Sequence, residues 1–135
     1  MYKQFLSKIF IPPFIVLLVH VAATILEWYE AVWWLDKPLH LLGGIAVGIS
    51  SYYLIVYFIN NDKLQVNWKP LLLLAIFAAT ALSAVSWEFM EFYLDQQVHI
   101  VMQPSVYDTI TDLIMGMLGG MTSGTILTYI AKLKK

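Results

Sequence analysis

The sequence contains no cysteine and no arginine, and only 13% of its 135 residues are charged. Without cysteine, the chain cannot use a disulfide, a thiolate metal ligand or a cysteine nucleophile. The absence of arginine and of any basic patch, with a formal net charge of −1, argues against nucleic-acid binding. An ordinary soluble domain carries about 25% charged residues, so the low charge excludes that class as well.

Four long apolar runs take up most of the chain, at roughly residues 9–31, 38–59, 70–93 and 108–130. Each run has about 20 residues or more, which at ~1.5 Å per residue can cross a ~30 Å hydrocarbon core. We therefore expect an all-α integral membrane four-helix bundle, with residues 1–135 as a single membrane domain. Prolines occur at or just before the start of each run, so we expect none to interrupt a span. They are Pro12, Pro13, Pro38, Pro70 and Pro104.

The charged residues separate onto the two sides of these spans. The positive-inside rule makes the lysine-rich side cytoplasmic, with both termini inside, in a multi-pass protein of the inner or plasma membrane. Only Lys37 lies on the outer side, whereas the cytoplasmic side has Lys3, Lys8, Lys63, Lys69, Lys132, Lys134 and Lys135. The outer side receives eight of the nine acids, namely Glu27, Glu30, Asp36, Glu88, Glu91, Asp95, Asp108 and Asp112.

A similar pattern occurs in both halves of the chain: a Glu-x2-Glu pair, a turn, then an aspartate followed by polar and glycine residues at every fourth position. It indicates a tandem two-helix repeat, with chance similarity as the alternative. Spacings of three and four put residues on one helix face, and glycines there let helices approach closely in lipid. The glycine faces therefore predict helix packing, within the chain or in a homo-oligomer. The two stripes are Asp36, His40, Gly44 and Gly48, and Asp108, Asp112, Gly116, Gly120 and Gly124.

The outer glutamates are harder to explain by structure alone than the outer aspartates. Asp36, Asp108 and Asp112 lie near helix starts, where the helix dipole favours negative charge and Asp36 can serve as an N-cap. Glu88 and Glu91 lie near a helix end, and a carboxylate within the apolar layer costs about 2.5–3.5 kcal/mol. Lys37 is the one nearby positive side chain, so bound protons or a bound cation must neutralise the cluster.

His40 favours a metal among these alternatives. Carboxylates with a histidine at the same depth fit Zn²⁺, Mn²⁺ or Fe²⁺ better than the all-oxygen ligand set of Ca²⁺. The expected ligands are His40, Glu88, Glu91, Asp108 and Asp112, with Glu88, Glu91 and Asp112 as catalytic groups. Glu27, Asp36 and Asp95 would orient the ligands or move protons. The alternative is a histidine that hydrogen-bonds a carboxylate without metal. We interpret His20 as a core histidine and His99 as a solvated loop residue.

The same residues resemble a family. The segments Asp36-Lys37-Pro38-Leu39-His40 and Trp87-Glu88-Phe89-Met90-Glu91 with Asp95, and the Asp108-x3-Asp112 pattern before the glycines, resemble uncharacterised YjdF-type bacterial membrane proteins. More distantly they are similar to VanZ-like proteins, which are associated with tolerance of glycopeptide antibiotics. The chain has Glu91 and Asp112 where VanZ-like proteins usually have glutamine and asparagine, and it lacks their outer-loop arginine. The resemblance supports the site and implies no particular reaction.

Three functions remain open from the sequence. The first is a metal-dependent hydrolase or transferase acting at the outer leaflet on a lipid or lipid-linked envelope intermediate. The second is a cation or proton transporter or channel component. The third is a non-catalytic membrane assembly protein whose acids are protonated or hydrogen-bonded.

Overall fold

The computed structural model describes residues 2–98 and 102–130, and these residues contain helices and no strand. The helices are α1 (Tyr2–Ile25), α2 (Trp28–Ala31), α3 (Asp36–Asn60), α4 (Lys69–Val98) and α5 (Val106–Ile130). All except the single turn α2 are long and apolar enough to cross a membrane. The expectation of an all-helical protein with four membrane spans is therefore confirmed.

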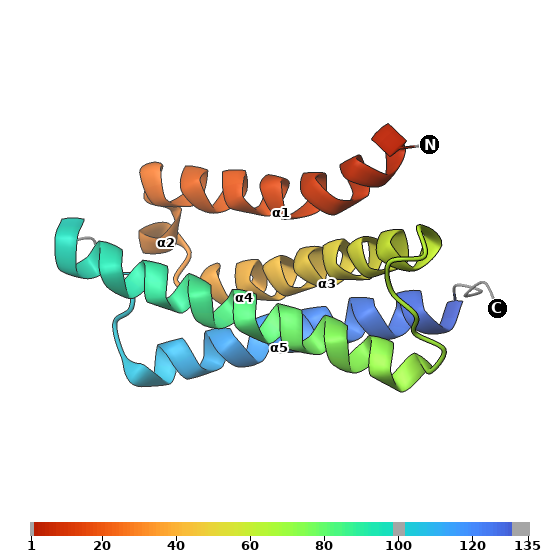
Figure 1. The fold of residues 1–135 in the computed structure, drawn as a ribbon. Coiled ribbons are helices and arrows are strands. Elements are labelled where there is room, and N and C mark those ends of the chain that lie inside the picture. The colour runs from red at the N-terminus through yellow and green to blue at the C-terminus, as the bar shows by residue number, and fades with distance from the viewer. Residues whose placement is uncertain (1, 99–101, 131–135) are drawn as a thin grey trace.

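The four long helices lie side by side and alternate in direction (Figure 1). The closest pair is α3 and α5, α4 packs on α5 and α3, and α1 packs mainly on α3. The start of α1 and the end of α5 lie at the same end of the bundle (Figure 1). The opposite end contains the end of α1, the starts of α3 and α5 and the end of α4. This second end carries the acidic residues.

The glycine faces of α3 and α5 pack against each other inside the chain. A Cβ atom on Gly44 would overlap the backbone of Gly116, and one on Gly48 would press on the backbone of Gly120. The glycine faces thus point into the bundle, as the stripes indicated. Because intrachain packing already covers these faces, they are not available as the homo-oligomer interface that we had considered.

The first helix differs from its predicted range of 9–31. It starts near Tyr2, so Pro12 and Pro13 lie inside α1, and the expectation that no proline interrupts a span was wrong. Pro13 has no N–H to donate to the carbonyl oxygen of Ile9, four residues earlier. Ser50 on α3 compensates, because its hydroxyl donates to that oxygen at 2.6 Å, with the carbonyl oxygen of Ala46 in its own helix as the more distant second acceptor at 2.9 Å. A neighbouring helix thus makes the interruption tolerable, as is common in membrane helices.

The polypeptide also turns earlier than predicted at the acidic end. Glu27 adopts a left-handed conformation with φ of 56°, and this turn separates α1 from α2. The start of α5 is capped locally: the Ser105 hydroxyl accepts a hydrogen bond from the backbone N–H of Asp108 at 3.1 Å. At α3 the N-cap is Leu35 rather than Asp36, which is the first residue of that helix.

Candidate functional site

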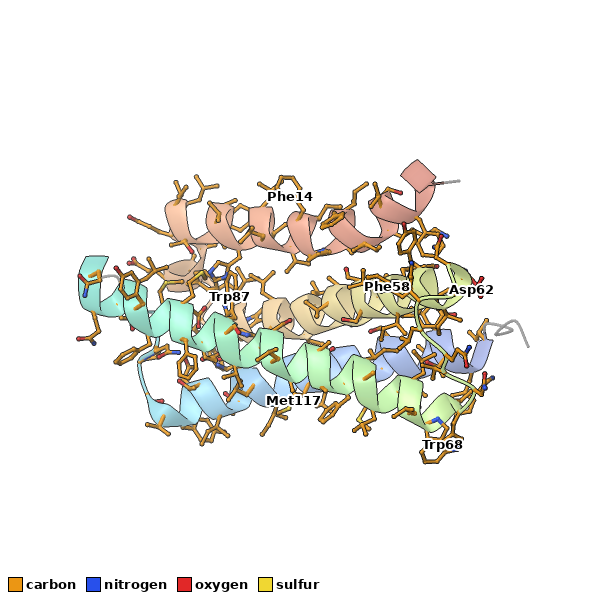
Figure 2. The ribbon with its side chains drawn as sticks, in the orientation of Figure 1. Phe14, Phe58, Asp62, Trp68, Trp87 and Met117 are labelled. Atoms are coloured by element: carbon orange, nitrogen blue, oxygen red, sulfur yellow. The ribbon has the colours of Figure 1, made fainter. Side chains whose placement is uncertain are left out.

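Polar side chains from all four long helices meet at the acidic end of the bundle. Trp87 marks this end in Figure 2, far from Asp62 and Trp68 at the other end. The end of α1 contributes His20, and the start of α3 contributes Asp36, Lys37 and His40. The second half of α4 contributes Trp87, Glu88 and Glu91, and the start of α5 contributes Asp108 and Asp112. Neighbouring helix ends therefore bring together residues that are distant in the sequence.

Lys37 binds the aspartates of this cluster. Its ammonium group lies 2.7 and 2.8 Å from the two carboxylate oxygens of Asp112. The same nitrogen contacts Asp108 and lies 3.3 Å from Asp36. Lys37 therefore neutralises part of the acidic cluster, as the one positive side chain that the sequence placed near these acids. Asp108 binds this lysine. It does not belong to either group of His, Asp and Glu side chains that lie close enough together to share a metal ion.

His40 lies between the aspartates and the glutamates. Its Nε2 atom is 3.4 Å from Asp36, 3.9 Å from Glu91 and 3.9 Å from Asp112. Its Nδ1 atom is 3.7 Å from Oε1 of Glu88. The imidazole is buried, yet Nε2 makes no hydrogen bond, and the same is true of Oε1 of Glu88. Polar atoms left unpaired in a buried place are costly, so these two need a partner.

The two glutamates are buried on one face of α4 and are oriented by hydrogen bonds. The Trp87 indole N–H donates to Oε1 of Glu91 at 2.8 Å. The side-chain amide of Gln103 donates to Oε2 of Glu88 at 2.8 Å and to the Glu88 carbonyl oxygen at 2.9 Å. Glu88 is 5% exposed and Glu91 is 3% exposed, so protein groups rather than bulk solvent fix both carboxylates.

Asp95 acts on the site through the loop between α4 and α5. Its two oxygens accept hydrogen bonds from the backbone N–H groups of Met102 and Gln103, at 2.6 and 2.9 Å. These bonds fix the backbone of Gln103, whose side chain then reaches Glu88. Asp95 is thus not beside His40. It is connected to Glu88 through one intervening residue.

His20 closes the cluster from the α1 side. Its Nδ1 atom is 2.7 Å from the hydroxyl of Tyr29, and its ring packs edge-on against Trp87 at 4.7 Å between centroids. Its Nε2 atom makes no hydrogen bond and is 4.0 Å from Oε1 of Glu91. Burial, together with the nearby carboxylates of Asp36 and Glu91, raises the pKa of the Tyr29 hydroxyl above its usual range. Tyr29 therefore keeps its proton.

Two groups of side chains place their ligand atoms within 4.8 Å of one another: Asp36 with His40 and Asp112, and His40 with Glu88 and Glu91. In a tetrahedral site, metal–ligand bonds of about 2.0–2.2 Å put two ligands of one ion about 3.3–3.6 Å apart. Both groups could therefore hold an ion after small side-chain movements. They differ in their other partners, because Lys37 already binds Asp112 in the first group.

Several predicted residues lie elsewhere. Glu27 and Glu30 are exposed beyond the end of α1, whereas Glu88 and Glu91 are buried within α4. The two Glu-x2-Glu pairs are therefore not equivalent in structure, and we correct the expectation that Glu27 orients the ligands. His99 lies outside the described residues.

Three contributors were not predicted: His20, Tyr29 and Gln103. Helix periodicity placed His20 on the inner face, but its approach to Glu91 depends on how α1 packs against α4. Tyr29 and Gln103 lie in the short connecting segments that fold back over the cluster. No residue spacing signals such contacts.

Comparison with known proteins identifies the family of this chain. No curated protein and no solved structure gives a significant match. The family described as "Predicted membrane protein (DUF2238)" matches residues 5–133, which include every helix that contributes to the cluster. This protein is therefore a member of the DUF2238 family of predicted membrane proteins.

Proposed function

We propose that this protein binds a divalent transition metal, Zn²⁺, Mn²⁺ or Fe²⁺, through His40, Glu88 and Glu91. With that metal it acts as an enzyme at the outer leaflet of the plasma or inner membrane. Its substrate is a lipid or lipid-linked envelope intermediate. The bound metal would polarise a phosphoryl or carbonyl oxygen and activate water.

The observation that carries this proposal is the pair of unsatisfied atoms at the centre of the cluster. Nε2 of His40 and Oε1 of Glu88 are buried and make no hydrogen bond. Each is an atom type that ligates transition metals, and both belong to residues whose ligand atoms converge with those of Glu91. A bound cation would satisfy these atoms and offset the cost of burying two carboxylates.

The charges around the cluster favour the glutamate group over the aspartate group. Asp112 uses both carboxylate oxygens to bind Lys37, so an ion placed there would lie beside a fixed positive charge. Glu88 and Glu91 instead receive neutral donors, the amide of Gln103 and the indole of Trp87. Hydrogen bonds of this kind orient a carboxylate ligand. Oε1 of Glu88 stays free for the metal, whereas Oε1 of Glu91, which lies 3.9 Å from His40, would bind the metal while it also accepts from Trp87. Asp112, 3.9 Å from His40, would accept or supply the proton that catalysis requires.

The opposing distribution of lysines supports placing the site outside the cytoplasm. Lys63 lies in the loop between α3 and α4, and Lys69 is the first residue of α4, so both are at the end of the bundle opposite to the cluster. If the positive-inside rule orients the chain, that loop faces the cytoplasm and the cluster faces the outer leaflet.

Transport of a cation or proton is the alternative. A path across the membrane would need polar groups beneath the cluster that are free to bind the ion. The buried hydroxyls of Thr80 and Ser123 instead donate to carbonyl oxygens of their own helices, Ile76 at 2.9 Å and Gly120 at 3.2 Å. The buried hydroxyl of Thr128 makes no hydrogen bond, but it lies near the far end of α5 and does not by itself form a path from the cluster. We therefore favour binding and catalysis over passage.

Metal quantification tests the proposal. Protein purified in mild detergent without chelators should contain one transition-metal ion per chain. The ion should be lost in His40→Ala and Glu88→Gln and kept in Glu27→Gln, which removes an exposed acid from the same end of the bundle. The proposal fails if wild-type protein holds no stoichiometric metal, or if all three variants retain the same amount. A flux measurement in liposomes separates the alternatives, because an enzyme would turn over substrate without moving ions.

A further inference from the structure

A cavity of about 260 Å³ lies directly beneath the cluster, among the membrane-spanning helices. Its walls come mainly from α1, α3 and α4, with one glycine of α5, and are largely apolar: Val16, Leu17, Leu39, Val47 and Ala84 are among the lining residues. Leu17 on α1 and Ser83 on α4 line the cavity and are exposed, so it opens sideways between these two helices. It is larger than the ~150 Å³ engineered cavity that binds benzene.

One end of this cavity is polar. His20 and His40 both line it, and their side chains are 9% and 8% exposed. Nε2 of each ring is buried and makes no hydrogen bond. In the tautomer in which the Tyr29 hydroxyl donates to Nδ1 of His20, the hydrogen of the neutral ring is on Nε2. His20 then presents an unused donor at the top of an apolar cavity.

The cavity lies at the bilayer depth of an acyl ester and the first part of its chain, and its length fits that part of the chain. Helix α3 has 25 residues and is therefore about 37 Å long, a few ångström more at each end than a ~30 Å hydrocarbon core. His40 lies four residues from its start, about 6 Å along the axis, close to the boundary where acyl esters lie. From His40 to Val47 on α3, the cavity extends about 10 Å further towards the bilayer centre.

We propose that this cavity takes one acyl chain of a diacyl phospholipid, which enters between α1 and α4, and that the ester carbonyl oxygen of that chain accepts a hydrogen bond from Nε2 of His20. The inference deepens the proposed function, because it names the substrate class and puts the ester beside His40. Binding of the chain itself needs no metal.

The bilayer explains why a lipid is the occupant. Lipid tails surround the opening at every moment, and a void lined by Val16 and Val47 loses dispersion contacts unless a chain fills it. Lipid is as apolar as the cavity wall, so the chain gains little free energy from the hydrophobic effect. Selection must therefore come from the polar end, where a buried donor without a partner strongly favours a ligand that carries an acceptor.

Gly43 provides a way to block the cavity without disturbing the fold. A Cβ atom at Gly43 would meet only Cγ1 of Val16, at 3.9 Å, which is ordinary van der Waals contact. Gly43→Leu should therefore fill the cavity. Ser83→Leu is a second blocking variant, since its exposed hydroxyl bonds only within its own helix, to Ala79. Ala78→Leu is the control. It also introduces a leucine side chain, but at an exposed position of α4 that does not line the cavity.

The test uses photo-crosslinking in vesicles of phosphatidylethanolamine and phosphatidylglycerol that contain a phosphatidylcholine probe with a diazirine on one acyl chain. Labelled peptides are mapped by mass spectrometry. In wild type we expect labels concentrated on the segments around Val16 and Val47. Gly43→Leu and Ser83→Leu should reduce this labelling about tenfold, while Ala78→Leu should leave it unchanged. Equal labelling in the blocking variants and in Ala78→Leu would overturn the proposal.

An ether-linked probe tests the polar end. It has the same chain and lacks the carbonyl acceptor, so wild type should label less with it than with the ester probe. His20→Phe, which keeps an aromatic ring and removes the donor, should label equally with both. No preference in wild type would refute the role of His20. Repeating the labelling after chelation separates this proposal from the metal: labelling that persists without metal supports the cavity even if no metal is found, and labelling that requires metal contradicts it.

Discussion

Lys37 donates to both carboxylate oxygens of Asp112, at 2.7 and 2.8 Å, and so joins the start of α3 to the start of α5. The two residues are 75 positions apart in the chain. Asp112 is 2% exposed, and Lys37 reaches it from the edge of the bundle. This ion pair gives the acidic end its own positive charge, and Lys37 contacts the aspartates Asp36, Asp108 and Asp112 rather than the two buried glutamates.

Removing the ammonium group of this pair should destabilise the protein. Loss of one partner of a fully buried pair costs about 3–5 kcal/mol. Lys37→Met should cost less than that, because the Lys37 side chain is 26% exposed, but it should still lower the melting temperature in detergent. Lys63→Met, an exposed lysine at the other end, should have no such effect. Adding Asp112→Asn to Lys37→Met should recover part of the loss. If the two single variants melt alike, the pair contributes nothing.

Two adjacent glycines should respond in opposite ways to the same substitution. A Cβ at Gly44 would overlap the backbone of Gly116, which cannot move aside without separating α3 from α5. Gly44→Ala should therefore cost about 1–3 kcal/mol or more. Gly43→Ala has room beside Val16 and gains about 1 kcal/mol of helix propensity, so it should be neutral or stabilising. Thermal unfolding of the two variants in the same detergent provides the comparison, and similar melting temperatures would contradict the packing described.

The hydroxyl of Ser50 should matter because of Pro13. Ser50→Ala leaves the carbonyl oxygen of Ile9 without its donor, at a cost of about 1–3 kcal/mol for a buried acceptor. In the Pro13→Ala background a backbone N–H replaces the missing donor, so the same Ser50→Ala change should cost little. A double-mutant cycle of unfolding measures this difference. Equal costs in both backgrounds would show that the two residues act independently.

The neutral donors to the two glutamates should tune metal affinity without being ligands. Gln103→Ala and Trp87→Phe each remove one hydrogen bond to a glutamate carboxylate and keep every proposed ligand. Loss of such partners typically weakens metal binding about 10–100-fold. Competition with a chromophoric chelator measures the affinity. The controls are Gln96→Ala, an exposed glutamine on α4, and Trp68→Phe at the opposite end, which should bind as wild type does.

The sequence predicts the spans well because the bilayer imposes a simple rule on length and polarity. Apolar runs located four membrane helices, and spacing put the glycine face of α3 inside the bundle. The break at Glu27 could not be predicted, because a left-handed turn of a non-glycine residue has no compositional signal. The position of α1 was also misjudged, since Pro12 and Pro13 resemble a helix start unless the donor from Ser50 is known.

The site was only partly predictable for a related reason. Helical spacing put His40, Glu88 and Glu91 at one depth, but it could not show that Lys37 turns towards the aspartates. Nor could it show that His20 approaches Glu91 across the gap between α1 and α4. Both facts depend on how the helices pack. The finer resemblance to YjdF-type and VanZ-like proteins stays a prediction beside the established membership of the DUF2238 family.

X-ray absorption at the metal edge tests the central claim most directly. Protein loaded with Zn²⁺ or Mn²⁺ should show nitrogen and oxygen ligands at about 2.0–2.2 Å, including imidazole scattering. Both the imidazole signal and the bound metal should disappear in His40→Ala and persist in Glu27→Gln. A spectrum with oxygen ligands alone, or one unchanged by His40→Ala, would contradict a metal centre built on His40, Glu88 and Glu91.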